Sequence, residues 1–286
     1  MARTASKSSR KYSKKSVEDK KAEVAALLTK AEEGVKSLKT SEGWKRWLSF
    51  QKSFHAYSLR NTMLIMCQYP EATQVTGFNT WKKHGRFVKK GEKSIRILAP
   101  SFRKVEKEDK SGEKKEEKIL AYFRTVGVFD VTQTEGEELP SPVQTLDCDV
   151  DPELFNRLVK ASVVPVNREE CSRGNGYYCS NERKIAVDSR LSPAQAIKTL
   201  VHEMAHSMLH ADRDKQGLSR ADAELEAESV AFIVCGAHGL DTSSYSFGYV
   251  TAWKGDNTAK TLKESAERIC SCAKKILEAV PADTTE

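Results

Sequence analysis

The chain has 286 residues, of which 39% are hydrophobic and 30% are charged. This length allows one large domain or two modest ones, and no stretch approaches the roughly 20 apolar residues that a membrane span needs. The basic N-terminus lacks the apolar segment of a secretory signal. Seven cysteines without a CxxC pair argue against both a disulfide framework and a structural zinc finger. We therefore expect a cytoplasmic protein that does not bind membranes.

Charge is distributed unevenly along the chain. Residues 1–100 carry a net charge of +14 and residues 101–286 carry −7, which together give the overall +7. This asymmetry indicates two units with different partners, and the basic unit favours a polyanion, most simply nucleic acid. Residues 1–21 are rich in Ser and Lys and are predicted to form a disordered basic tail.

The first part of the chain predicts two helices followed by short strands. Apolar residues recur at helical spacing in residues 16–40 and again in residues 44–67. A short strand is expected at residues 73–79, a loop at residues 80–93 and a second strand at residues 94–100, which end at a proline.

A highly charged segment separates this part from the rest. Residues 103–118 mix both signs of charge, which is typical of an exposed hairpin tip or loop. The β-rich run of residues 119–131 is expected to pair with residues 94–100 across that tip. Two prolines, Pro140 and Pro142, then mark a linker, and we place the domain boundary near residue 140.

The second part predicts one hairpin among helices. The hairpin covers residues 174–187 and turns at residues 180–182. Helices are expected near residues 152–160, 192–210, 219–237 and 258–279, and the second of these begins with Ser192 and Pro193.

The helix that begins at Ser192 contains the sequence His-Glu-Met-Ala-His. His202 and His206 lie one turn apart on the same face, so both imidazoles can reach one metal ion. Glu203 follows the first histidine directly and is placed to take a proton from a water at the metal. The ligand types favour Zn²⁺.

The third ligand is expected from the next helix. Glu224 and Glu228 are four residues apart and share a face, so one can bind metal while the other holds a ligating histidine by a hydrogen bond. We assign Glu224 as the ligand and Glu228 as its supporting partner, with the exchange of roles still open. Glu226 is about 200° from Glu224 around the helix and is expected to face solvent. His210 is interpreted as a histidine at the helix end.

A basic and aromatic cluster occupies residues 79–93, with six Lys or Arg among fifteen residues. Cations neutralise phosphates, and aromatic rings stack on unpaired bases. The alternative is that Trp81 and Phe87 belong to the core and that the lysines are only solvated. The candidate nucleic-acid contacts are Arg60, Asn61, Trp81, Lys82, Lys83, Arg86, Lys89, Lys90 and Lys93.

The C-terminal part resembles zinc metallopeptidases of the HExxH class, and within them the ImmA/IrrE-like group. The resemblance rests on the hairpin Tyr177–Val187, on His202–His206 and on Glu224–Ala231. It implies a zincin-like fold with Glu224 as the third zinc ligand.

The N-terminal part is similar to the single-stranded-DNA-binding domain of ArdC-type antirestriction proteins. The matching segments follow one another in order at residues 57–61, 68–73, 77–81, 84–93 and 128–136. The combination of the two parts is itself ArdC-like. It implies a protein of mobile elements that shields incoming DNA from restriction.

Together these patterns predict an α+β protein with two domains. A tail of residues 1–21 precedes an α+β domain at residues 22–140 that binds single-stranded DNA, and a zincin-like metallopeptidase domain covers residues 141–286. Hydrolysis would use Zn²⁺ held by His202, His206 and Glu224, with Glu203 as the general base and a protein as the possible substrate. Two alternatives stay open: an ImmA-like regulatory protease that cleaves a repressor, and a non-catalytic DNA-binding protein with a structural zinc.

Overall fold

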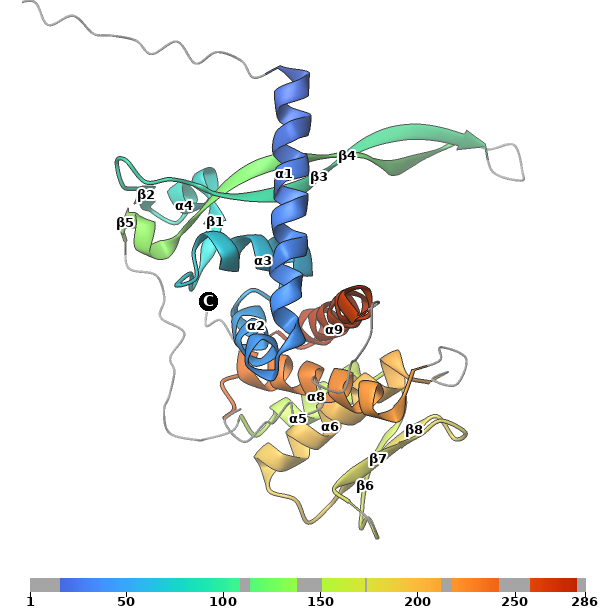
Figure 1. The fold of residues 1–286 in the computed structure, drawn as a ribbon. Helices are drawn as coiled ribbons and strands as arrows, with labels where there is room; N and C mark the ends of the chain where they lie inside the picture. Colours follow the sequence, from blue (N-terminus) through green and yellow to red (C-terminus); the bar gives the residue numbers. More distant parts are fainter. Residues whose placement is uncertain are drawn as a thin grey trace, which may run out of the picture.

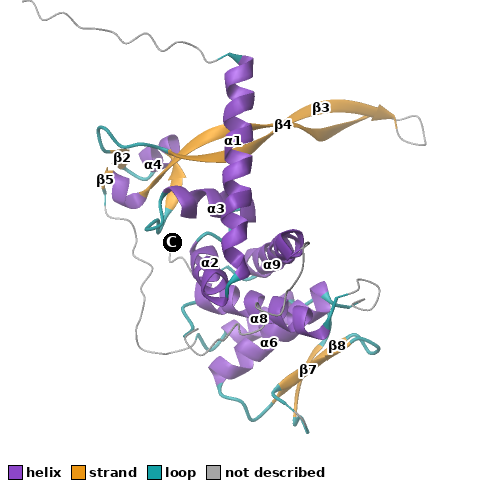
Figure 2. Cartoon of the chain, in the orientation of Figure 1, coloured by secondary structure: helices purple, strands orange, loops and turns teal. Residues whose placement is uncertain are grey.

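The computed structural model confirms the α+β class (Figures 1 and 2). It describes residues 16–108, 114–137, 151–172, 174–211, 218–241 and 258–281. The predicted linker around Pro140 and most of the predicted tail lie outside these residues. None of the described helices is long and apolar enough to cross a bilayer.

The first helix, α1 (Val17–Lys36), begins earlier than the predicted end of the tail at residue 21. Ser16 caps it, because its hydroxyl accepts a hydrogen bond from the Asp19 amide at 3.0 Å and the Asp19 carboxylate accepts one from the Ser16 amide at 3.1 Å. Such a reciprocal cap satisfies two amides that the helix itself leaves unpaired. A short 3-10 turn, η1 (Ser37–Lys39), follows.

The single helix predicted for residues 44–67 is wrong, because the chain forms two helices there. These are α2 (Ser41–Ser53) and α3 (Leu59–Gln68). The break occurs where Phe54 stacks on Phe50, with ring centroids 4.5 Å apart. The Ser58 hydroxyl then accepts from the Asn61 amide and starts α3. Helical periodicity continues across the break, and this is why the sequence pattern did not reveal it.

The loop predicted for residues 80–93 is also wrong in part. After strand β1 (Val75–Gly77), the chain forms the short helix α4 (Phe78–Lys83) and strand β2 (Arg86–Val88). Strand β2 pairs with β5 (Thr134–Gly136), which follows the 3-10 turn η2 (Val131–Gln133). A two-stranded sheet therefore holds the basic cluster in place.

A long antiparallel ribbon dominates the N-terminal part. Strands β3 (Ile95–Glu108) and β4 (Lys114–Asp130) pair as predicted, with Ile95 opposite Val128, and β1 adds to the other edge of β4. Residues 103–118 were predicted to be an exposed hairpin tip or loop. Residues 103–108 and 114–118 instead extend both strands, and residues 109–113 lie outside the described residues. The ribbon projects away from α1 and α3 in Figure 1. Among the described side chains of this segment, Arg103, Lys104, Glu116 and Lys118 are exposed.

The C-terminal part places a small sheet beside a group of helices. The elements are α5 (Leu154–Ala161), β6 (Val166–Glu169), β7 (Gly176–Cys179), β8 (Lys184–Asp188), α6 (Pro193–Leu209), α8 (Arg220–Ala237) and α9 (Thr258–Ala279). The predicted hairpin is confirmed as β7 paired antiparallel with β8, and β6 pairs with β8 in parallel. Helices α6 and α8 pack against each other, and both contact α9.

Within the described residues there are two hydrophobic cores. The smaller core lies between α1, α3, the beginning of β3 and the end of β4, and it includes Leu64, Ile97 and Val128. The larger one contains the helices of the C-terminal part, together with Trp44 and Trp47 of α2. Helix α2 therefore packs on α8 although it precedes the ribbon in sequence. The division into domains at residue 140 stays a prediction.

Candidate metal centre and nucleic-acid surface

The packing of helix α6 determines the direction in which its two histidines point, because the opposite face of the helix is buried. Pro193 occupies the first turn, where its missing amide hydrogen costs nothing. Ala196, Ile197, Leu200 and Val201 are then fully buried in the larger core. This packing fixes the rotation of α6, so that His202 and His206 face the start of α8.

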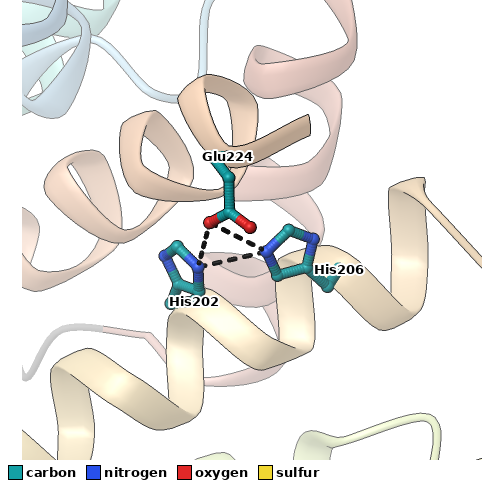
Figure 3. A group of neighbouring side chains, drawn as sticks. All are labelled: His202, His206 and Glu224. Carbon is teal, nitrogen blue, oxygen red and sulfur yellow. Dashed lines mark hydrogen bonds and ion pairs between the residues drawn. The ribbon is translucent and has the colours of Figure 1, made fainter. Parts of the chain in front are cut away.

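The two histidines and Glu224 converge on one point (Figure 3). The Nε2 atoms of His202 and His206 lie 3.1 Å apart, and Glu224 Oε2 lies 3.3 Å from the first and 3.6 Å from the second. One ligand atom from each residue falls within a group no wider than 4.8 Å. Two imidazoles and a carboxylate at this spacing form a possible metal site.

Glu228 occupies a different position from Glu224. Its Oε2 atom lies 3.3 Å from Nδ1 of His202, on the side of the ring away from the three converging atoms, and Lys198 Nζ lies 3.0 Å from its Oε1 atom. The geometry thus gives Glu224 the place of a ligand and Glu228 the place of a partner that orients His202. Both roles stay predictions.

Glu203 lies next to the converging atoms and is almost fully buried. Burial raises the pKa of its carboxyl, although the neighbouring His202 and His206 and the Tyr178 amide of β7 act in the opposite direction. A carboxyl with a raised pKa transfers protons more readily near neutral pH. The residue has the environment expected of a general base.

Glu226 contradicts its predicted solvent-facing position. It does point away from the converging atoms, but its side chain is fully buried between α8 and α9. There it accepts hydrogen bonds from Ser265 Oγ at 2.6 Å and from Arg268. The prediction failed because it considered α8 alone, and α9 covers the face that would otherwise meet water.

Three of the predicted nucleic-acid contacts have structural roles. Trp81 is 2% exposed, and its Nε1 atom donates to the Phe129 carbonyl at 2.8 Å. The Asn61 amide pairs with both backbone groups of Leu98, and the Arg86 guanidinium bonds to Thr134. The Trp81 ring is therefore not exposed for the predicted stacking on bases. Near Trp81 in sequence, the rings of Phe78 and Phe87 are exposed.

The remaining predicted contacts are one half-buried arginine and five exposed lysines, of which Lys89 donates from Nζ to the Thr132 carbonyl at 2.9 Å. Arg60 lies half-buried, with its guanidinium carbon 5.5 Å from the centre of the Phe123 ring. The exposed lysines are Lys82, Lys83, Lys89, Lys90 and Lys93. Their contact with nucleic acid stays a prediction.

The ribbon adds a surface that the sequence analysis missed. Phe102 and Tyr122 are more than half exposed, and they border a shallow hollow. Four cationic side chains line the same hollow: Arg103, Lys104, Lys118 and Arg124. The high local charge suggested a hairpin tip or loop, and that prediction did not reveal which side chains the pairing of β3 with β4 brings together.

Comparison with known proteins identifies the N-terminal part. Residues 18–129 match the family model of the N-terminal domain of the anti-restriction factor ArdC. The chain is therefore of the ArdC type in its N-terminal part. This ArdC-type region contains α1 to α4 and nearly all of the ribbon.

Whole-chain comparisons give more distant relatives. An uncharacterized protein of Bacillus anthracis is 25% identical over 320 residues, an alignment that covers 97% of this chain and 54% of the relative. The chain thus spans about half the length of that curated protein. Two crystal structures of the antirestriction ArdC protein from plasmid R388 are also similar. The metal-free form has a TM-score of 0.45 at 24% identity, with 77% of this chain and 81% of that chain covered. The Mn(II)-bound form has a TM-score of 0.44 at 23% identity, with 77% and 84% covered.

Proposed function

We propose that the chain is a metal-dependent peptidase joined to a single-stranded-DNA-binding domain. The convergence of His202, His206 and Glu224 beside the buried Glu203 carries the first part of this proposal. Three protein ligands of the nitrogen and oxygen type leave a coordination position for a reactant, which distinguishes catalytic zinc sites from closed structural ones. Imidazole donors favour zinc over Mg²⁺ or Ca²⁺.

The donor set fits this ion. The three atoms belong to side chains that are partly shielded from water, and each histidine turns one ring nitrogen inward and the other toward a hydrogen-bond partner. A bound zinc ion supplies a Lewis acid that acidifies water and polarises a peptide carbonyl. Within the chain, Glu203 accepts the proton of the attacking water and returns it to the leaving amine.

The second part of the proposal concerns DNA. The match to an ArdC N-terminal domain, the +14 charge of residues 1–100 and the exposed lysines of residues 82–93 support binding to a polyanion. Exposed aromatic rings at Phe87, Phe102 and Tyr122 favour a strand with unpaired bases, because such bases can stack on them. Coating of single strands would shield incoming DNA from restriction enzymes.

The peptidase proposal is tested with one conservative variant. Glu203→Gln removes the base but keeps the size of the side chain, so the variant should bind one zinc per chain and lose hydrolysis of fluorescein-labelled casein. Glu32→Gln, at an exposed position on α1, is the matched control and should change neither property. Zinc binding without any hydrolysis by the unaltered chain, with or without a single-stranded oligonucleotide, would instead favour a non-catalytic role for the metal.

The DNA proposal is tested by a salt series. Full-length protein is titrated onto a labelled oligothymidylate, with unlabelled duplex as competitor. Binding should weaken steeply as salt rises, and duplex should compete poorly. Lys89→Ala with Lys90→Ala should lower the salt slope by about 1.4, because each phosphate contact to a single strand contributes about 0.7. The charge-preserving pair Lys89→Arg and Lys90→Arg should keep the slope, and equal competition by duplex would contradict the preference for single strands.

A further inference from the structure

We propose that His210, Glu226 and Arg268 form a hydrogen-bonded network that fixes the orientation of the His206 ring and thereby strengthens metal binding. This inference rests on the metal site proposed above and concerns residues outside the ligand set. His210 ends α6, Glu226 lies on α8 and Arg268 lies on α9. The network therefore connects α6, α8 and α9 to one proposed metal ligand, His206.

The contacts run in one continuous line. Nδ1 of His206 lies 3.0 Å from Nδ1 of His210, and Nε2 of His210 lies 3.3 Å from Oε2 of Glu226. The guanidinium of Arg268 donates to both oxygens of Glu226, at 2.5 Å from Nη2 to Oε1 and at 3.1 Å from Nε to Oε2. Ser265 adds a hydrogen bond to Oε1.

The direction of these hydrogen bonds follows from the chemistry of the ligand. A neutral histidine that offers Nε2 to a metal carries its proton on Nδ1, so His206 donates to His210. Nδ1 of His210 must then be unprotonated, and this histidine carries its proton on Nε2, facing Glu226. A carboxylate held by Arg268 is an acceptor without a proton. Glu226 thus selects the tautomer of His210, and His210 in turn selects the tautomer of His206.

The location of the network makes this selection firm. Glu226 is fully buried and His210 is 7% exposed. The Glu226 carboxylate forms an ion pair with Arg268 and accepts a hydrogen bond from Ser265, and these contacts compensate for the burial of its negative charge. A buried carboxylate without such partners would be strongly destabilising. The charged form is therefore part of the native structure.

The geometry separates His210 from the metal ligands. Its Nδ1 atom contacts the outer nitrogen of His206, whereas the converging donors are the Nε2 atoms and Glu224. The other ligand has a simpler support, because Nδ1 of His202 meets Glu228 directly and this carboxylate is a quarter exposed. The His206 branch is longer, and its His210 and Glu226 side chains are buried.

The test compares variants of His210 in the full-length protein. His210→Phe fills the buried site but can neither accept from His206 nor donate to Glu226. His210→Gln retains both an acceptor and a donor. We expect the first to raise the dissociation constant for zinc by about 10- to 100-fold, as outer-sphere changes at zinc sites do, and the second to restore a large part of the affinity. Competition against a chelating dye measures both constants.

Nitrogen NMR of the histidine rings gives an independent readout. In the zinc-loaded protein, His206 should carry its proton on Nδ1, and in His210→Phe this ring should show exchange between orientations. Urea unfolding of the metal-free variants serves as the folding control, since equal midpoints for His210→Phe and His210→Gln assign the difference to the metal site. Wild-type zinc affinity and an unchanged His206 spectrum in His210→Phe would overturn the inference. Failure of the unaltered chain to bind zinc would instead refute the metal site itself.

Discussion

Trp44 on α2 donates a hydrogen bond from its indole Nε1 to the hydroxyl of Ser229 on α8, over 3.0 Å. Both side chains are fully buried, and Ser229 directly follows Glu228 in the helix that also carries Glu224. A residue of the ArdC-type region therefore takes part in the core that supports the candidate metal centre. The two functional parts of the chain share this contact.

We expect Trp44→Ala to destabilise the whole protein by about 3–5 kcal/mol, because it removes a large buried ring and leaves a cavity. Trp44→Phe keeps most of the packing but strands the Ser229 hydroxyl, so it should cost about 1–3 kcal/mol. Urea unfolding monitored by circular dichroism measures both changes. Wild-type stability of Trp44→Phe would show that the hydrogen bond contributes little beside the packing.

A related prediction concerns a fragment of residues 141–286. Without α2, the fragment exposes the face of α8 that Trp44 and Trp47 cover, both of which are completely buried in the full chain. We expect the fragment to bind a hydrophobic dye and to bind zinc more weakly than the full chain. A fragment of residues 41–286 is the comparison, because it restores α2. Wild-type zinc affinity in the shorter fragment would support an independent C-terminal domain.

Gly176 on β7 is required by the close approach of α6. A Cβ atom at this position would lie 2.6 Å from the Ala186 carbonyl oxygen and 2.6 Å from Cγ2 of Thr199. Gly176→Ala should therefore destabilise the protein by about 1–3 kcal/mol and displace the strand that contacts Glu203. Gly77→Ala is the control, since nothing lies within 4 Å of its Cβ position. Denaturant unfolding of the two variants distinguishes crowding from a general effect of alanine.

Asp188 should make the folding stability of the protein depend on pH in the acidic range. Hydrogen bonds from the Arg190 side chain and amide hold the pKa of its carboxyl well below the usual value, although burial acts against them. Because the folded pKa is depressed, its contribution is complete above the unfolded pKa of about 3.9 and is lost as the pH falls below that value. We expect the difference in urea midpoint between the unaltered chain and Asp188→Asn to shrink from pH 6 to pH 3. Glu32→Gln should instead follow the unaltered chain at every pH.

Zinc should stabilise the folded chain by mass action. A free concentration 100 times the dissociation constant contributes about 2.7 kcal/mol, and a chelator should reverse the gain. Glu203→Gln should retain this stabilisation because Glu203 lies outside the proposed ligand set, whereas His206→Ala should lose it. Thermal unfolding with and without zinc measures both. An equal rise for His206→Ala would place the ion at some other site.

Local patterns predicted most of the helices and the main strand pairs. The helices at Pro193–Leu209 and Arg220–Ala237 begin and end close to their expected positions, because their capping residues and apolar periodicity act over a few residues only. The pairing of residues 94–100 with residues 119–131 was predictable because two strand-like segments lie on either side of one charged segment. The predictions failed at Phe54, where α2 ends although the apolar periodicity continues, and at residues 103–108 and 114–118, where strand pairing extends into a segment predicted as a hairpin tip or loop.

The sequence alone determined that His202 and His206 face the same way and that Glu203 stands beside them, because the period of a helix dictates it. It predicted Glu224 as the third ligand and Glu228 as its supporting partner, with the exchange of roles left open. Tertiary structure decided where these side chains lie. The packing of α8 on α6 brings Glu224 to both Nε2 atoms, and α9 buries Glu226 against Arg268. These positions depend on how separate helices pack, and no spacing within one helix encodes that.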